Sequence, residues 1–592
     1  MRWLLRDPAR FLHEQAELEK LSTEHWLKAL AWRLGGEFGV EVDVDMEIHG
    51  SLYAMTLTYP DLFPETPAYI RPRDSAEHWS GHQYGPGGSL CLEYRADNWD
   101  RQITGANLLR SAYKLLVTER HPDKPSQVAS AHRQTQGQRL QASGYRLVCT
   151  AELSVKLSSL PAVGMFRLNV KEAFHETATV VFVCELESVN RDSSMEGVSD
   201  VPAGITSFGP FFALSGRGRV LKSKEFDEPG NVSTVDELLA LASRAGFDSE
   251  KILEGFSETI GDSIVLLVGS TLKGMRAFGI AKGDKPSLRR YSVIRPEKHA
   301  DRLPEEHTEL KQSRIGMIGL GSIGSKVALS LARSGVRRFL LVDDDLLLPE
   351  NICRNELSWA GVGIHKAEAV REALSLVALD PEIGVRIHRV AGQESAVAAA
   401  AALKDLAACD LLVDATANAE VFLRLAAVAR MAKRPLCWGE VFAGGLGGLI
   451  ARARPGIDPN PVAVRNAILS YLETQPPAPY RQAGGYDIEA QVPVIATDSD
   501  VTLVAGALSR FVLDALLRAK ESQYPYSAYL LGFRNEWIFS QPFDTQPITV
   551  SGPGWDDGPS ASDEERLNAV KLLLKLAAER QDDHSDSATG SG

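Results

Sequence analysis

The feature that most constrains the fold is a glycine loop in the middle of the chain. The run Gly319-Leu320-Gly321-Ser322-Ile323-Gly324 follows the apolar residues 315–318, and we expect a helix to open at Ser325. Glycines at this spacing let the backbone approach a phosphate, and a helix N-terminus presents its amides and dipole to it. Such a loop belongs to strands that alternate with helices, so the sequence predicts a Rossmann-like α/β unit with a parallel sheet.

Two apolar runs downstream support this unit. Residues 339–342 and 411–413 suit central parallel strands that are buried on both faces. Asp343 comes directly after the first run, at a strand end where a carboxylate can bind ribose hydroxyls. An NAD-dependent oxidoreductase fits these features as well as an ATP-binding enzyme does.

Further polar residues separate the two interpretations. They are Asp345, Asn351, Arg354, Lys366 and Asp414. Nicotinamide chemistry does not need this set, whereas adenylation of a carboxylate does. It requires cations for a triphosphate, a carboxylate for Mg²⁺ and groups that stabilise charge at the α-phosphate.

In order and approximate spacing, this set resembles the ubiquitin-activating (ThiF-like) superfamily, which includes the adenylating enzymes of thiamine and molybdopterin biosynthesis. The resemblance covers 311–535 and implies ATP and Mg²⁺ as cofactors. It also implies a homodimer formed through this domain. The residues that it assigns to the nucleotide are Gly319, Gly321 and Gly324 in the loop, Asp343 on the ribose, Asn351, Arg354 and Lys366 on the phosphates, and Asp414 on Mg²⁺, with Asp345 as a further candidate near the metal.

Residues 1–125 read as a separate α+β unit. We expect an opening helix over Asp7–Leu34, strands over 40–46 and 52–57, and a closing helix near 107–116. Cys91 lies between these elements, just after a glycine-rich loop, which suits an accessible thiol.

This unit resembles ubiquitin-conjugating enzymes. The similarity lies in the proline-containing stretch 63–70, in Cys91 and in Trp99 eight residues after it. It implies that Cys91 carries an acyl group as a thioester and yields it to an amine. The family's His-Pro-Asn turn is missing. His82 occupies roughly its place, the asparagine has no counterpart, and Tyr84, His82 or backbone amides are the possible substitutes.

Activating enzymes usually keep a cysteine of their own, and this chain lacks one where we expect it. The loop 485–500 contains no cysteine. Cys353, beside Arg354, is an alternative acyl acceptor, whereas Cys437 lies on a predicted buried strand and Cys409 lies beside a core strand, where we expect structural roles.

Two routes for the acyl group therefore stay open. Cys91 attacks the adenylate directly, or a hydroxyl of Thr497 or Ser499 first forms an oxyester, with Asp498 or Asp500 as base.

Net charge and hydrophobicity limit the expected binding partners and cellular location. The 592 residues carry a net charge of −13, which argues against non-specific binding to nucleic acid or anionic membrane. There is no long apolar run and no signal peptide at the start, so we expect a cytoplasmic protein. The remaining predicted segments are a middle mixed α/β domain over 145–300 for docking or spacing, an extension over 536–580 with a helix at 562–580, and a disordered tail over 581–592.

A conjugating domain ahead of an activating domain resembles the bacterial fusion enzymes of phage-defence and ubiquitination-like operons. The resemblance implies a ubiquitin-like protein as partner and a protein lysine as target. The alternatives are a sulfur-carrier-activating enzyme, an NAD-dependent oxidoreductase with a structural N-terminal domain, or a scaffold whose conjugating fold is inactive.

Overall fold

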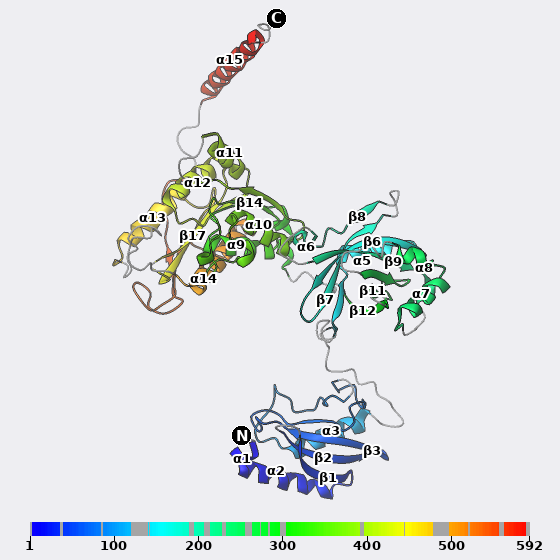
Figure 1. The fold of residues 1–592 in the computed structure, drawn as a ribbon. Helices are drawn as coiled ribbons and strands as arrows, with labels where there is room; N and C mark the ends of the chain where they lie inside the picture. The colour runs from blue at the N-terminus through cyan, green and yellow to red at the C-terminus, as the bar shows by residue number, and fades with distance from the viewer. Residues whose placement is uncertain are drawn as a thin grey trace. The chain divides into compact units, whose positions relative to one another are not determined.

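The structure is a computed structural model, and Figure 1 shows its fold. The residues it describes are 3–35, 39–84, 87–119, 140, 143–188, 194–206, 213–227, 232–254, 263–272, 274–281, 285–295, 303–390, 396–442, 444–477, 496–518, 521–555 and 562–587. The chain divides into two compact units, Met1–Gln141 and Ala142–Gly592, and each is described by itself.

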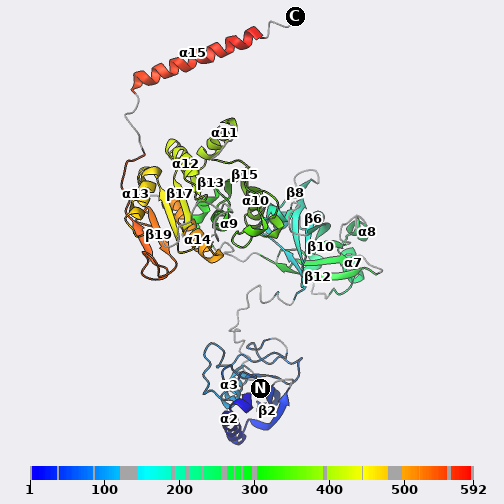
Figure 2. The ribbon, with the colours of Figure 1, turned by 60° about the vertical axis from the view of Figure 1, so that its left-hand side comes forward.

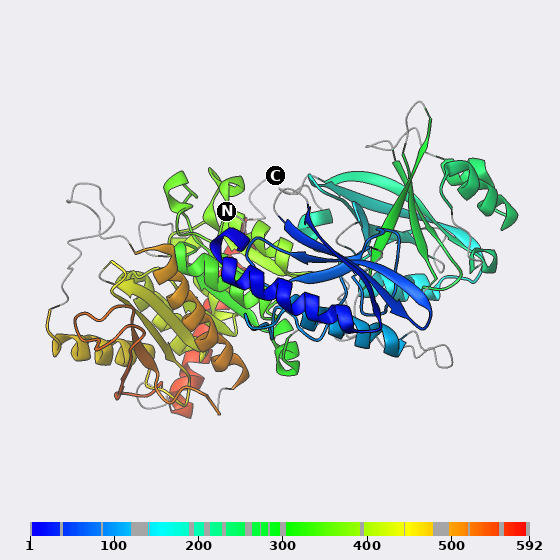
Figure 3. The same ribbon diagram turned by 90° about the horizontal axis from the view of Figure 1, so that it is seen from below.

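The first unit is an antiparallel meander with a helix before it and a helix after it. Its sheet has the order β1-β2-β3-β4. Figure 3 shows these strands in blue with the long helix α2 beside them. The elements are α1 (Trp3–Arg6), α2 (Pro8–Lys20), β1 (Leu27–Gly35), β2 (Gly39–Ile48), β3 (Ser51–Tyr59), β4 (Tyr69–Pro72) and α3 (Gly105–Glu119).

A buried carboxylate joins three of these elements. Glu14 on α2 accepts hydrogen bonds at Oε2 from the Tyr59 hydroxyl and from the Gly105 backbone N–H, each at 2.7 Å. Burial, and next the nearby Glu14 charge, raise the pKa of Tyr59 well above its ordinary value. The bonds fix the start of α3, which positions the long irregular stretch between β4 and α3 that contains Cys91.

The expected opening helix is wrong in its second half. Helix α2 ends at Lys20, and Leu27–Gly35 is the edge strand β1. As an edge strand, β1 is largely exposed and shows no strict alternation of apolar side chains. Its pairing with β2, for example Trp32 with Val42, overrides the helical spacing of its leucines. The strands expected at 40–46 and 52–57 and the helix expected at 107–116 are confirmed as β2, β3 and α3.

The N-terminal part of the second unit is a closed barrel. Its sheet has the order β5-β12-β11-β10-β9-β6-β7-β8, and an additional pairing of β5 with β7 closes all strands except β8 into a ring. The strands are β5 (Tyr145–Val148), β6 (Gly164–Phe174), β7 (Thr179–Glu187), β8 (Met195–Gly197), β9 (Ala213–Lys222), β10 (Ser263–Val268), β11 (Arg276–Ala281) and β12 (Ser287–Ile294). The accompanying helices are α5 (Ala151–Ser159), α6 (Ala203–Thr206), α7 (Val235–Arg244) and α8 (Ser249–Leu253).

The C-terminal part is an open sheet of the order β15-β14-β13-β16-β17-β18-β19-β20. The five neighbouring strands β15, β14, β13, β16 and β17 are parallel to one another. Strands β18, β19 and β20 are added to this sheet in antiparallel pairings. The strands are β13 (Arg314–Ile318), β14 (Arg338–Val342), β15 (Glu382–Arg386), β16 (Leu411–Asp414), β17 (Leu436–Phe442), β18 (Gly447–Ala453), β19 (Ala528–Gly532) and β20 (Thr545–Ile548). The strand order reverses direction between β13 and β16, which is where open α/β sheets bind ligands.

Helices cover both faces of this sheet, as Figures 1 and 2 show. One core contains residues of α9, α10 and α14, and the other contains residues of α11, α12 and α13. These helices are α9 (Ser322–Arg333), α10 (Lys366–Val377), α11 (Ala396–Ala407), α12 (Ala419–Ala432), α13 (Pro461–Glu473) and α14 (Asp498–Leu517). The Rossmann-like prediction is confirmed, with one correction. Helix α9 starts at Ser322 rather than Ser325, because Gly321 is its N-cap and Gly324 lies in its first turn.

The last element is α15 (Asp563–Ser587), which extends beyond the expected end of the helix at Arg580 into the segment predicted to be disordered. Residues 588–592 of that segment lie outside the described residues. None of the described helices combines the length and the apolar character that crossing a bilayer requires.

Candidate active site at the carboxyl edge of the open sheet

The glycine loop connects β13 to α9 in a conformation that only glycine can adopt at two of its positions. Gly319 has a φ of +80°, and a Cβ there would lie 2.7 Å from Thr416 Cγ2. At Gly324 a Cβ would lie 1.8 Å from the Gly319 carbonyl oxygen. At Gly321, by contrast, a Cβ would meet nothing within 4 Å. The open side at Gly321, at the N-terminus of α9, is therefore where an anion can approach the backbone.

Asp343 holds this loop from the neighbouring strand end. Its Oδ2 accepts a hydrogen bond from the Leu320 N–H at 2.5 Å, and its Oδ1 accepts one from the Asp345 N–H at 2.9 Å. Burial raises the pKa of Asp343, and these two bonds oppose that rise. Asp345 in turn forms an ion pair with Lys366, whose Nζ lies 2.7 Å from Oδ2. The structure thus brings Asp343, Asp345 and Lys366 together beside the loop.

The Asn351–Arg354 turn is tied to the same loop through its flanking residues. Asn351 Oδ1 accepts from the Leu348 N–H at 3.0 Å, and the Arg354 N–H donates to the Asn351 carbonyl oxygen at 3.2 Å. Asn355, the next residue, is buried and donates through Nδ2 to the Leu320 carbonyl oxygen at 3.4 Å. The half-buried Arg354 is therefore adjacent in sequence to Asn355, which is hydrogen-bonded to the glycine loop.

Asp414 lies on the other side of the switch point, at the end of β16. Thr416 donates to its Oδ1 twice, from the hydroxyl at 2.6 Å and from the backbone N–H at 3.0 Å. Burial raises the pKa of Asp414, which the Thr416 bonds partly offset. Both donors use Oδ1, so among the described residues Oδ2 accepts no hydrogen bond and is available to a cation.

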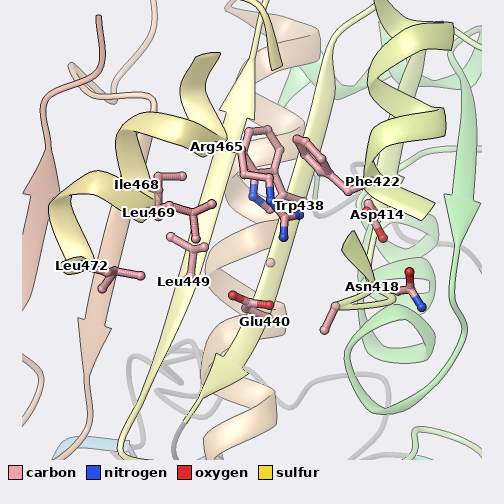
Figure 4. A pocket seen from close by; sticks show the side chains of 12 residues that line it. Asp414, Asn418, Phe422, Trp438, Glu440, Leu449, Arg465, Ile468, Leu469 and Leu472 are labelled. Carbon is pink, nitrogen blue, oxygen red and sulfur yellow. The ribbon is translucent and has the colours of Figure 1, made fainter. Parts of the chain in front are cut away.

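A pocket opens beside Asp414, between β17, α12 and α13 (Figure 4). Glu440 and Arg465 contribute its other charges, and the Arg465 guanidinium lies 4.8 Å from the centroid of the Phe422 ring. Burial raises the pKa of Glu440, an effect that Arg465 opposes and Asp414 reinforces. The remaining lining is mainly apolar, including Trp438, so the pocket suits a peptide-like group more than a polyanion.

The two hydroxyl candidates lie at the start of α14. Thr497 is its N-cap: the hydroxyl accepts from the Asp500 N–H at 3.4 Å and donates to Asp500 Oδ2 at 2.8 Å. Ser499 is exposed in the first turn. Between them, Asp498 forms an ion pair with Lys326 on α9, with Nζ and Oδ1 2.8 Å apart. The ion pair ties the start of α14 to the helix that follows the glycine loop. Most of the 485–500 loop lies outside the described residues.

Cys91 lies in the first unit, in the irregular stretch between β4 and α3, and is half-buried. Its N–H donates to the His82 carbonyl oxygen at 2.6 Å. The His82 ring faces the end of α3, with Nε2 3.7 Å from the buried Glu119 carboxylate. Tyr84 is exposed, and the Trp99 indole N–H donates to the Pro64 carbonyl oxygen at 2.8 Å.

An asparagine orders the turn just after Cys91. Asn98 Nδ2 donates to the Glu93 carbonyl oxygen at 2.9 Å, and its Oδ1 accepts from the Arg95 N–H at 2.7 Å. No pattern in the sequence distinguished Asn98 from other exposed loop residues.

The other cysteines divide by burial. Cys409 and Cys437 are buried, and burial raises their pKa values to about 11 and about 12 respectively. Such thiols stay protonated at neutral pH and are poor nucleophiles. Cys353 is exposed, with its Sγ 3.3 Å from the Glu350 carbonyl oxygen.

Several site residues escaped the sequence analysis. Glu440 follows the same rule as Asp414, because it lies towards the carboxyl end of a parallel strand, and that rule could have found it. Arg465 and Lys326 lie on helices, where a single basic residue has no distinguishing pattern. Their roles depend on which helix packs beside them.

The site lies within a recognised family domain. Residues 299–468 match the model of the ThiF family, and this part of the chain is a ThiF family domain. The matched range includes the loop and the strand ends from Gly319 to Asp414, but neither Cys91 nor Thr497.

Similar curated proteins match part of the chain. The "Probable adenylyltransferase/sulfurtransferase MoeZ" of Mycobacterium tuberculosis (strain CDC 1551 / Oshkosh) is 31% identical over 26% of this chain and 39% of its own length. The "ATP-dependent ubiquitin transferase-like protein Cap2" of Vibrio cholerae is 28% identical over 29% of this chain and 27% of its own length. The chain thus spans well under half of these relatives.

Solved structures resemble the chain in part. PaaA has a TM-score of 0.32 and 16% identity over 41% of this chain and 75% of its own. E. coli MccB, solved with ATP, has a TM-score of 0.32 and 15% identity over 43% of this chain and 68% of its own.

Proposed function

We propose that the ThiF family domain adenylates the C-terminal carboxylate of a ubiquitin-like protein and that Cys91 then carries the acyl group to a lysine. The observation that supports adenylation most is the meeting of three groups at one switch point. These are the open glycine loop at Gly321, the ribose-competent Asp343 and the buried Asp414. One named relative, MoeZ, is a probable adenylyltransferase/sulfurtransferase, which supports the same reaction.

The proposed reaction has three steps. A carboxylate oxygen attacks the α-phosphorus of ATP, and the bond between this phosphorus and the oxygen that bridges to the β-phosphate breaks. The products are an acyl adenylate and pyrophosphate. The Cys91 thiolate attacks the acyl carbon, and AMP departs with the bonding electrons. A lysine amine then attacks the thioester, loses a proton and releases the thiolate.

The residues at the site fit Mg·ATP. The loop amides at the start of α9 and the cations of Arg354 and Lys366 would hold the phosphates. Oδ2 of Asp414 would hold Mg²⁺, which neutralises phosphate charge when bound. Lys366 would exchange its bond with Asp345 for a phosphate oxygen, since a doubly charged ligand competes with a single carboxylate.

The pocket beside Asp414 would receive the last residues of the ubiquitin-like tail. It lies next to the proposed metal ligand, and its apolar lining suits an extended peptide. Arg465 and Glu440 roughly balance each other in charge, which favours an uncharged tail segment there.

In the first unit, Asn98 would take the loop-ordering role of the missing asparagine. It fixes the turn after Cys91 through two hydrogen bonds, whereas the exposed Tyr84 is a candidate to contact the incoming chain.

An oxyester on Thr497 or Ser499 is an additional proposed step. The Lys326–Asp498 ion pair supports it, because it holds both hydroxyls near α9. Asp500 already accepts a hydrogen bond from the Thr497 hydroxyl, which is the arrangement that a general base needs.

ATP–pyrophosphate exchange tests the proposal. We expect exchange that depends on Mg²⁺ and is stimulated by a ubiquitin-like protein ending in glycine, followed by a reducible adduct on Cys91. Exchange without any adduct on Cys91 would support adenylation but contradict transfer to Cys91, and it would point to a sulfur-carrier-activating enzyme. Absence of exchange together with reduction of NAD⁺ would contradict the proposal.

A further inference from the structure

Helix α15 presents large apolar side chains to solvent between residues 567 and 576. Six of them are half-exposed or more, namely Leu567, Val570, Leu572, Leu573, Leu574 and Leu576. Figure 2 shows the helix along its length. A single helix of this kind is only marginally stable in water, and its apolar face normally gains stability from a packing partner.

The start of α15 is nevertheless built to be helical. The Glu565 carboxylate accepts a hydrogen bond at Oε2 from the Ser562 N–H at 2.7 Å, and the Ser562 hydroxyl accepts one from the Glu565 N–H at 3.3 Å. This reciprocal pattern is a capping box. The hydrogen bonds from Ser562 lower the pKa of Glu565. A deliberately capped helix with an uncovered apolar face indicates a docking element rather than a frayed tail.

Three of these apolar residues form a continuous seam. Leu567, Val570 and Leu574 are separated by three and then four residues, which is the repeat of a coiled coil. Leu572 points away from this seam, because it follows Leu567 by five residues. At about 100° per residue, its side chain lies about 140° around the helix axis from that of Leu567.

The flanking charges select the occupant and its direction. Glu564 and Lys571 are seven residues apart and flank the seam on the same side, whereas Arg566 flanks it on the other. In a parallel pair of two copies, Arg566 would face Lys571 of the second copy, which is repulsive. In an antiparallel pair, Glu564 would face Lys571 of the second copy, twice by symmetry.

We propose that α15 pairs with α15 of a second copy of this chain as a short antiparallel coiled coil. Leu567 of each copy packs against Val570 of the other, and two Glu564–Lys571 ion pairs flank this layer. The contact is independent of the adenylation chemistry and of any contact between ThiF domains.

Complementing variants of the full chain test the pairing. A chain with Glu564→Gln and a chain with Lys571→Gln are co-expressed and treated with a zero-length carbodiimide, which joins a carboxylate to a lysine in contact. Neither chain can form the 564–571 link within itself, so a link must join two copies. We expect a covalent dimer with Glu564 joined to Lys571, and none from either variant alone.

Two matched serine variants decide whether the seam is responsible. Leu567 and Leu572 are almost equally exposed, at 54% and 58%, but only Leu567 lies in the seam. Leu567→Ser in both chains is expected to reduce the link at least tenfold, whereas Leu572→Ser leaves it unchanged. Absence of the link, an equal loss in both serine variants, or links from Glu564 only to residues outside α15 would overturn the proposal.

Discussion

The open sheet and the Cys91 region hold their reactive groups in different ways. At the sheet edge, Asp343 directly follows one parallel strand and Asp414 is the last residue of another, and backbone N–H groups donate hydrogen bonds to both carboxylates. Cys91 instead lies in a long irregular stretch that is held by individual hydrogen bonds, which the His82 carbonyl oxygen accepts and which the side chains of Asn98 and Trp99 donate. The difference suits the proposed chemistries. A nucleotide needs a rigid, charged cradle, whereas a thiol that meets two large protein substrates needs access.

The largest effect should come from removing the thiol. Cys91→Ala is expected to abolish the reducible adduct with a ubiquitin-like protein while ATP–pyrophosphate exchange continues, because the two groups act in separate steps. Intact-mass spectrometry after incubation with Mg·ATP measures the adduct. Cys353→Ala is the matched control and should retain it. Loss of the adduct in Cys353→Ala alone would move the acceptor to the activating domain.

Paired glycine variants sharpen the view of the sheet edge as a rigid cradle. Gly324→Ala places a Cβ 1.8 Å from the Gly319 oxygen, whereas Gly321→Ala meets nothing within 4 Å. We expect Gly324→Ala to lower the free energy of unfolding by about 1–3 kcal/mol and to abolish ATP binding. Gly321→Ala should fold normally and still bind ATP about tenfold more weakly, since a phosphate must approach that backbone. Urea unfolding and calorimetry measure the two quantities, and equal behaviour of both variants would contradict the geometry.

Asp414→Asn should separate function from stability. Exchange is expected to fall by about 100-fold, the size usual for one group that stabilises developing charge. The nucleotide-free protein should become more stable near neutral pH. Because burial raises the pKa of Asp414 above its ordinary 3.8, the folded protein loses stability as the pH rises through that raised value. The gain from Asn should therefore shrink as the pH falls towards 3.8. A variant that is less stable than the wild type at neutral pH would contradict this assignment.

The smallest effect concerns Thr497. Thr497→Ala removes the N-cap of α14 and should cost about 1 kcal/mol of stability, whereas Thr497→Asn keeps a capping side chain and should cost little. If Thr497 forms an oxyester, both variants lose that adduct, although only Ala destabilises. Each Thr497 variant is then combined with Ser499→Ala. If both double variants form the Cys91 adduct at the wild-type rate, the hydroxyl route is contradicted and direct transfer to Cys91 is supported.

The sequence predicted the open sheet better than the first unit for a physical reason. Parallel strands are buried on both faces, so runs such as 339–342 are unambiguous, and their carboxyl ends locate Asp343 and Asp414 without knowledge of packing. The edge strand β1 has no such signal, and the spacing of its leucines predicts a helix instead.

Contacts set by tertiary packing were not predictable in this way. The closure of the barrel by β5 and β7 depends on a pairing between strands separated by a long segment. Likewise Lys326 reaches Asp498 only because α9 and α14 share one face of the sheet.

The most direct test of the central claim is equilibrium binding of nucleotides to the full chain by calorimetry. We predict that ATP binds in a Mg²⁺-dependent manner, that Asp414→Asn weakens this binding about tenfold or more, and that NAD⁺ does not bind. Binding of NAD⁺, or ATP binding that depends on neither Mg²⁺ nor Asp414, would contradict it.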